Sequence, residues 1–202
     1  MTATDAQRLV LAEDAQNLLF RQARTANSFS DEPVTDEQLR AIYDLVKWAP
    51  TSMNQQPLRI VLVRSQEGKQ RLLPHLIEGN RGKTEQAPVV AILAADTEFH
   101  ENLPRVFPHK PGAKDLFADE GVRTGNATFN AALQVGYFIL GVRAAGLAAG
   151  PMTGYDAAGL DREFFPDGRL RSLVVVNIGK PGENPWAERL PRLDYDEIVT
   201  EV

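Results

Sequence analysis

The polar segment Trp48-Ala49-Pro50-Thr51-Ser52-Met53-Asn54-Gln55-Gln56-Pro57 connects a predicted helix to a predicted strand. Residues 36–49 before it carry apolar side chains with a 3.6-residue period, which predicts an amphipathic helix. The β-branched run 58–63 after it predicts a strand. Two prolines enclose hydroxyl and amide groups that donate and accept hydrogen bonds. The segment therefore fits either an ordinary polar connection or a binding loop for a neutral, planar ligand with many polar atoms.

The composition indicates one globular domain, residues 1–202, with enough chain to bury a core. The net charge of −5 disfavours nucleic acid or an anionic membrane as a partner. The chain has no cysteine, so it has no disulfide, thiol nucleophile or thiolate metal ligand. Residues 1–5 lack the pattern of a signal peptide, and the longest apolar run, 89–95, is too short to span a bilayer. We expect a cytoplasmic protein.

The N-terminal part predicts a helix over residues 14–23 that turns Leu18, Leu19 and Phe20 inward. It is followed by Arg24-Thr25-Ala26-Asn27. A cation beside a hydroxyl and an amide can hold a phosphate through charge-assisted hydrogen bonds. A solvated arginine at the end of a helix would show the same pattern.

Further elements follow from periodicity and capping signals. Thr35 and Gln38 have the spacing of a capping box. Asn80 and Lys83 are three residues apart and would share one face of a helical turn. Continuous apolar runs predict strands, and the segment 120–145, apolar nearly all round, predicts a buried central helix that another helix approaches closely at its glycines. The predicted strands span residues 88–95 and 170–178, and a short helix is predicted from residue 65 or 66 to residue 73.

The stretch between residues 97 and 119 is rich in aromatics and prolines, and we expect an irregular excursion with short helices. Excursions of this length often serve as lids. His109 either lines the substrate side of this excursion or is an ordinary surface histidine.

Several common catalytic patterns are absent from the sequence. It has no glycine fingerprint for a dinucleotide, no P-loop and no G-x-S-x-G motif. The three histidines lack the spacing of a zinc site, so no metal site is predicted. An enzyme without an evident nucleophile, metal or base can rely on a bound cofactor.

The segment Pro50 to Pro57 resembles the P-S-S-x-N-x-Q-P loop of the FMN-dependent nitroreductases, and the resemblance extends from about Phe20 to Val202. It implies an α+β fold with a mixed, mostly antiparallel sheet flanked by helices. It also implies an obligate homodimer with FMN at the interface, across which the loop reaches the flavin. The C-terminal tail would be swapped onto the partner subunit.

The resemblance also implies which residues contact the flavin. Arg24, with Arg189 or Arg192 from the tail, would hold the phosphate, and the backbone N–H of Gly154 would point at flavin N5. The family commonly has Arg-x-Ser-x-Lys near the first contact, but this sequence has Asn27 at the position of the lysine. The other implied contacts are Thr25, Pro50, Thr51, Ser52, Asn54, Asn80, Lys83, Pro151, Met152 and Thr153, of which Thr153 is paired with Gly154 as a catalytic position.

The activity implied by the resemblance is ping-pong hydride transfer from NADPH or NADH through FMN to a small acceptor. The string Leu103 to His109 is similar to the malonic semialdehyde reductase branch, which forms 3-hydroxypropionate. The alternatives are a broad-specificity nitro or quinone reductase, and a non-catalytic protein that binds flavin or senses redox state.

Overall fold

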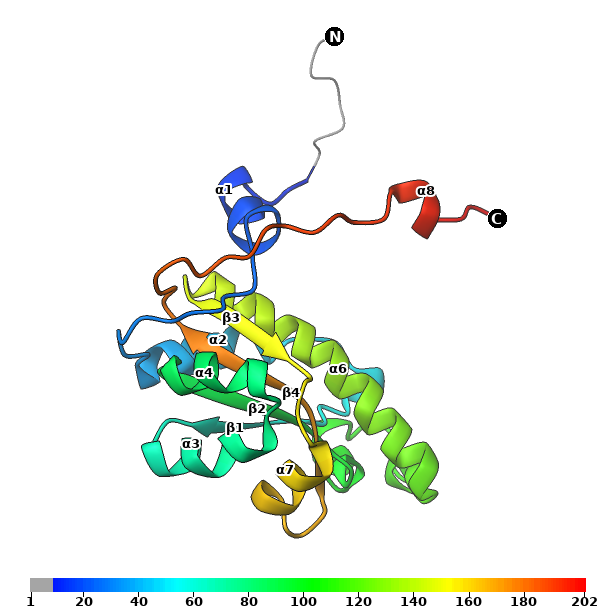
Figure 1. Ribbon diagram of the computed structural model, residues 1–202. Helices are drawn as coiled ribbons and strands as arrows, with labels where there is room; N and C mark the ends of the chain where they lie inside the picture. The colour runs from blue at the N-terminus through cyan, green and yellow to red at the C-terminus, as the bar shows by residue number, and fades with distance from the viewer. Residues whose placement is uncertain (1–8) are drawn as a thin grey trace.

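A four-stranded antiparallel sheet forms the centre of the computed structural model, which describes residues 9–202 (Figure 1). Residues 1–8 lie outside the described part, and so do residues 1–5, for which the sequence predicted no signal peptide. The strand order is β1-β2-β4-β3, and every pairing in it is antiparallel. The strands are β1 (Leu58–Val63), β2 (Val89–Asp96), β3 (Ala148–Met152) and β4 (Leu170–Gly179). The predicted α+β class with a mostly antiparallel sheet is confirmed.

Strand β2 divides the core into two layers because its side chains alternate between the faces of the sheet. Val90, Ile92 and Ala94 belong to one apolar cluster with residues of helices on that face, α3 (Gln66–Leu72) and α7 (Ala157–Phe164). The alternate residues of β2 belong to a second cluster with α2 (Asp36–Val46) and α6 (Glu120–Ala144). Helix α4 (Glu78–Gln86) also lies on the α3 side in Figure 1.

The predicted capping box starts α2: Thr35 Oγ1 accepts from the N–H of Gln38, and the Gln38 side chain accepts from the N–H of Thr35. The helix ends at Val46, three residues earlier than the sequence predicted. Residues before a proline are disfavoured in helical conformation, and Pro50 follows closely. The chain therefore leaves the helix before it enters the polar loop.

Helix α6 is only half-buried in the single chain, so the prediction of burial on all sides is wrong for this state. Phe129 is 66% exposed and Tyr137 is 44% exposed. Gly141 does allow a close helix approach, because an added Cβ would collide with the side chain of Val46 in α2. A Cβ at Gly125 or Gly136 would meet nothing within 4 Å.

The two terminal segments differ from the predicted pattern. The N-terminal helix consists of α1 (Glu13–Gln16) and a π-helical turn, η1 (Asn17–Arg21), and it ends two residues early. Leu18 and Phe20 are exposed in the single chain, which contradicts their predicted inward orientation. In the C-terminal tail, α8 (Tyr195–Ile198) is a single helical turn.

The excursion between β2 and α6 contains short helical turns, as predicted. Its aromatic and aliphatic side chains form a third apolar cluster around Phe99, Leu103 and Phe117, packed against α6. His109 is exposed, and its ring lies against Phe107 with 3.9 Å between centroids. The turns are η4 (Phe99–Asn102), α5 (Leu103–Val106) and η5 (Ala113–Phe117); η2 (Ser52–Asn54) and η3 (Leu73–His75) are similar turns elsewhere. Within residues 9–202, no helix combines the length and hydropathy needed to cross a bilayer.

Candidate functional site

An arginine-rich cavity forms where the N-terminal segment, the end of α6 and the C-terminal tail meet. Its volume is about 280 Å³, and we call it the arginine cavity. Among the residues that line it, Glu188 is the one carboxylate. The polar residues that line it include Arg24, Thr25, Asn27, Arg143, Arg189 and Arg192. Arg24, Arg189 and Arg192, which the resemblance assigns to the FMN phosphate, are therefore brought together here with Thr25 and Asn27, although they are far apart in the sequence.

Backbone contacts fasten the tail onto the N-terminal segment and so close the arginine cavity. The N–H of Asn27 donates to the carbonyl of Pro185 at 2.9 Å, and Ala26 and Trp186 form an antiparallel bridge. The Arg189 guanidinium donates to the carbonyls at the end of the π-helical turn, Arg21 O at 2.9 Å and Ala23 O at 3.0 Å. Arg189 thus holds the wall of the cavity in place and also contributes a positive charge to it.

Arg143 is the member of the cavity that the sequence did not single out. It lies in the last turn of α6, where a cation is expected simply because it complements the helix dipole. Its Nε is buried and has no hydrogen-bond partner among the described residues. Burial, and the nearby positive charge of Arg189, lower the pKa of the Arg143 guanidinium. A bound anion would relieve both effects, and guanidinium groups bind phosphate through paired hydrogen bonds.

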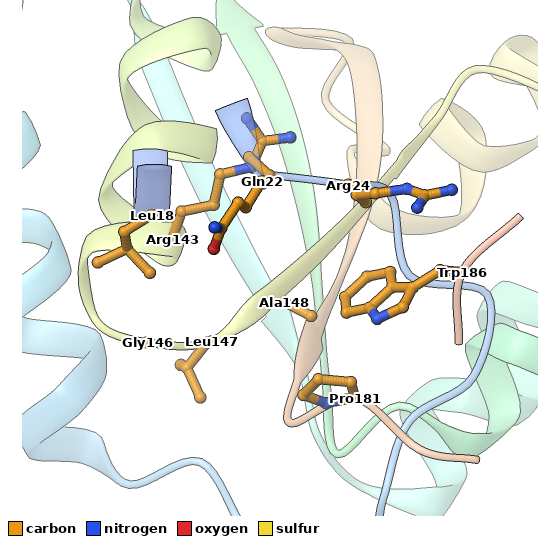
Figure 2. A pocket seen from close by; sticks show the side chains of 10 residues that line it. Leu18, Gln22, Arg24, Arg143, Gly146, Leu147, Ala148, Pro181 and Trp186 are labelled. Carbon is orange, nitrogen blue, oxygen red and sulfur yellow. The ribbon is translucent and has the colours of Figure 1, made fainter. Parts of the chain in front are cut away.

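A second, more apolar cavity of about 220 Å³ adjoins the arginine cavity and shares Ala23, Arg24 and Arg143 with it. Figure 2 shows its side chains, which come from the N-terminal helix, the end of α6, the start of β3 and the segment after β4. Trp186 contributes an indole ring to its wall. The two cavities together offer charged groups next to an apolar surface.

At the other end of β3, Asn80 from α4 meets the backbone of Gly154. The Asn80 side chain is 8% exposed, and its Nδ2 donates to the carbonyl of Gly154 at 3.0 Å. The N–H of Ile77 donates to the same carbonyl at 3.1 Å. The N–H of Gly154 makes no hydrogen bond to any described residue, so it is available to a ligand.

The remaining predicted contacts of this region lie on the same segment or opposite it. Met152 is buried, and its sulfur lies 3.7 Å from Thr84 Oγ1. Thr153 is exposed and Pro151 is partly buried. Lys83 is partly buried and forms no ion pair with a described residue. Burial raises the pKa of Tyr155, so its phenol stays neutral beside Gly154.

Strand β3 connects the two ends of the candidate site. It begins at Ala148, which lines the apolar cavity, and ends two residues before Gly154. Its five residues span roughly 14 Å, because strands rise about 3.4 Å per residue. At Gly150 an added Cβ would meet the carbonyl of Ala26 at 3.0 Å, so the glycine allows the N-terminal segment to lie along the strand. An elongated ligand with a phosphate at one end and a polar ring at the other fits this layout.

The polar loop that follows α2 is held in a strained conformation. Met53, Asn54 and Gln56 have φ values of 50°, 53° and 47°, in the left-handed region that residues with a Cβ rarely adopt. Asn130 of α6 holds the loop, because its Oδ1 accepts from the N–H of Ser52 at 2.7 Å and its Nδ2 donates to Gln55 at 3.0 Å. Backbone strain of this kind concentrates at functional sites.

The side chains of the loop do not enter the two cavities of their own chain. Pro50 and Ser52 are exposed, and Thr51 Oγ1 accepts from the N–H of Gln56 at 3.2 Å. Asn54 is exposed, but its Nδ2 donates to the carbonyl of Val106 in α5 at 2.8 Å, which ties the loop to the excursion. The loop therefore presents its polar groups away from the site that β3 organises.

One group of potential metal ligands occurs among the described residues, Glu98, His100 and Glu101, with the ligand atoms within 4.8 Å of one another. Its carboxylates already face cations: Glu98 pairs with Arg123 at 3.2 Å and Glu101 with Lys114 at 2.7 Å. These positive charges oppose the binding of another cation. The candidate site along β3 therefore relies on arginine, amide and backbone groups.

Comparison with known proteins gives a consistent result. The model of the Nitroreductase family matches residues 20–180. A protein of Streptomyces griseus is 66% identical over 195 residues, 96% of this chain and 99% of its own length, and one of Streptomyces coelicolor is 64% identical with the same coverage. Both carry the name "Putative NADH dehydrogenase/NAD(P)H nitroreductase". A solved structure from Exiguobacterium sibiricum, described as a "putative nitroreductase in complex with FMN", has a TM-score of 0.83 at 18% identity and covers 95% of this chain and 98% of its own.

Proposed function

This chain belongs to the Nitroreductase family, and on that premise we propose that it is an FMN-dependent NAD(P)H oxidoreductase. The observation that carries the proposal is the arginine cavity, which β3 connects to the free N–H of Gly154. Four arginines around about 280 Å³ suit a phosphate ester, and the buried Nε of Arg143 lacks any other partner among the described residues.

The residues divide into two groups in this proposal. Arg24 and Arg143, with Arg189 or Arg192, hold the FMN phosphate, and Thr25 adds a hydroxyl donor. Asn80 and Lys83 face the polar edge of the ring, where preorganised donors stabilise developing negative charge, whereas Asn27 lines the arginine cavity and belongs to the phosphate end. Gly154 directs its N–H at N5, next to Thr153. When bound, FMN supplies the hydride chemistry between NAD(P)H and the acceptor.

We also propose that the active unit is a homodimer in which the polar loop of one subunit completes the site of the other. One ridge of α6 carries Phe129, Leu133 and Tyr137, which are 66%, 43% and 44% exposed. Residues 193–202, which follow the part of the tail that lines the arginine cavity, are exposed along their whole length and are available to wrap a partner. Apolar patches of this kind mark interfaces.

Replacing Leu133 by aspartate is expected to shift the protein from dimer to monomer, because a charge on this ridge would be buried without a partner. Sedimentation velocity at micromolar concentration measures the change. Leu116→Asp is the matched control: Leu116 is 54% exposed in the excursion, outside the ridge, and its replacement should leave the dimer intact. A wild-type protein that sediments as a monomer would refute the shared site.

For the acceptor we propose malonic semialdehyde, reduced to 3-hydroxypropionate. Support comes from the similarity of the Leu103 to His109 string to that branch, with the excursion 97–119 acting as a lid. A broad-specificity nitro or quinone reductase is the second candidate, because His109 is exposed and adds no group to the described cavities. A non-catalytic flavin-binding or redox-sensing protein would use the same phosphate site.

The visible spectrum of the purified protein tests the function. Oxidised flavin absorption that bleaches with NADPH or NADH in the absence of oxygen is the expected result. Rates of NAD(P)H oxidation with malonic semialdehyde, a nitroarene and a quinone as acceptors then identify the preferred acceptor. Bleaching without turnover of any acceptor would favour the non-catalytic alternative, and a protein that neither contains nor binds FMN would contradict the proposal.

A further inference from the structure

A second cationic cavity lies beside the polar loop, away from the site organised by β3. It is bounded by α2, the loop itself, the start of β1, the excursion and α6, and its volume is about 360 Å³. It shares no lining residue with the arginine cavity or the apolar cavity. Small-molecule sites typically enclose about 300–1,000 Å³, so the space is sufficient for part of a ligand.

The side chains that line this second cavity carry a net positive charge. Lys47, Arg59 and Arg105 line it, and no carboxylate does. Lys47 pairs with Asp44 at 2.7 Å, and Arg59 pairs at 2.6 Å with Asp96, a carboxylate that it shares with another arginine. Arg105 reaches only the amide oxygen of Asn102 at 3.4 Å and forms no ion pair with a described residue.

The side-chain amide of Gln134 also offers a hydrogen-bond donor to this cavity. Gln134 of α6 lines it and is 8% exposed. Its Oε1 accepts from the N–H of Leu58 at 2.9 Å, whereas its amide nitrogen donates to no described residue. The amide nitrogen of Gln134 is therefore available to an acceptor group in the cavity.

We propose that the second cationic cavity binds an oxyanion, a phosphate or carboxylate, carried by the hydride donor or the acceptor. Arg105 and Lys47 supply the charge, and the amide of Gln134 supplies a directed hydrogen bond. A guanidinium and an amide both donate to such oxygens, and hydrogen bonds to charged groups are the stronger ones. The inference rests on the proposed function, because a reductase of this type must admit a donor and an acceptor next to FMN.

Isothermal titration of the protein with saturating FMN tests this site without any turnover. The two probes are 2′,5′-ADP, which carries the phosphate of NADPH, and malonate, a small carboxylate. We expect at least one of them to bind, and Arg105→Gln to weaken that binding by about tenfold or more. Lys110→Gln is the matched control, because Lys110 is an exposed cation of the same excursion that does not line the cavity.

The probe that binds identifies the source of the oxyanion. Preference for 2′,5′-ADP assigns the cavity to the donor, and preference for malonate assigns it to the acceptor. Gln134→Leu should weaken the same probe while the melting temperature shows that the protein is folded. The site is rejected if neither probe binds, or if Arg105→Gln and Lys110→Gln weaken binding equally. A flavin that NADPH fails to reduce would count against the proposed function and leave this binding result unaffected.

Discussion

Replacing Gly154 by valine is expected to slow the reduction of bound FMN by NADPH by about 100-fold or more, the range found when one preorganised donor is lost from a reacting centre. An added Cβ would lie 2.6 Å from Ile77 Cδ1 and 2.9 Å from Asn80 Nδ2. Ile77 is 57% exposed and can move, but Asn80 is buried and donates to the carbonyl of Gly154 itself. The backbone around Gly154 must therefore shift, and its free N–H shifts with it.

Anaerobic stopped-flow absorbance measures this rate, and overpacking should also cost about 1–3 kcal/mol of stability. Gly82→Val is the matched control, because a Cβ at Gly82 in the neighbouring helix α4 would meet nothing within 4 Å. The control should retain a reduction rate close to that of the wild type. If Gly154→Val reduces FMN at the wild-type rate, the proposed role of the Gly154 N–H is wrong.

Replacing Asp96 by asparagine is expected to lower the free energy of unfolding by about 3–5 kcal/mol at pH 7, as for other broken buried ion pairs. The Asp96 side chain is fully buried at the end of β2. Arg169 donates to both of its oxygens at 2.8 Å, Arg59 donates at 2.6 Å, and the N–H of Glu98 donates at 2.9 Å. One carboxylate thus joins β1, β2 and the segment that leads into β4.

The same contacts predict how stability depends on pH. Burial alone would raise the pKa of Asp96, but the hydrogen bond from Arg169, the charge of Arg59 and the N–H of Glu98 outweigh it and lower the pKa. Because the pKa of Asp96 is lower in the folded state, the ionised carboxylate stabilises the fold at every pH above its pKa in the unfolded state, about 3.9. This stabilisation is lost as the pH falls through its pKa in the folded state. The difference in stability between wild type and Asp96→Asn should therefore shrink below about pH 4.

Urea unfolding followed by circular dichroism, at one protein concentration and several pH values, measures both effects. Asp44→Asn is the matched control. Its ion pair with Lys47 has a similar length, 2.7 Å, but the Asp44 side chain is 65% exposed, so the loss should stay within about 1 kcal/mol. If both variants lose the same free energy of unfolding, the ion pairs of Asp96 contribute no more to stability than an exposed pair does.

The elements with strong local patterns were predictable from the sequence. β1 begins and ends at the expected residues, β2 and β4 differ by one residue at their ends, and the capping box starts α2 where it was expected. Strand β3 was missed because Ala148-Ala149-Gly150-Pro151-Met152 contains small residues, glycine and proline, which have little strand preference. It is a strand because it pairs with β4 at the edge of the sheet, where proline is tolerated.

The sequence by itself determined the helix and strand periods, the polar loop and the motifs that relate this chain to its family. Only the tertiary structure decided that Arg143 joins Arg24 and the tail arginines, and that α6 leaves one ridge exposed. The physical reason is that sequence patterns reflect local interactions, whereas the site is built from residues far apart in the chain. Periodicity and capping report on neighbouring residues, whereas the contact between Arg189 and Ala23 spans 166 positions and exists only after the sheet has brought both ends together.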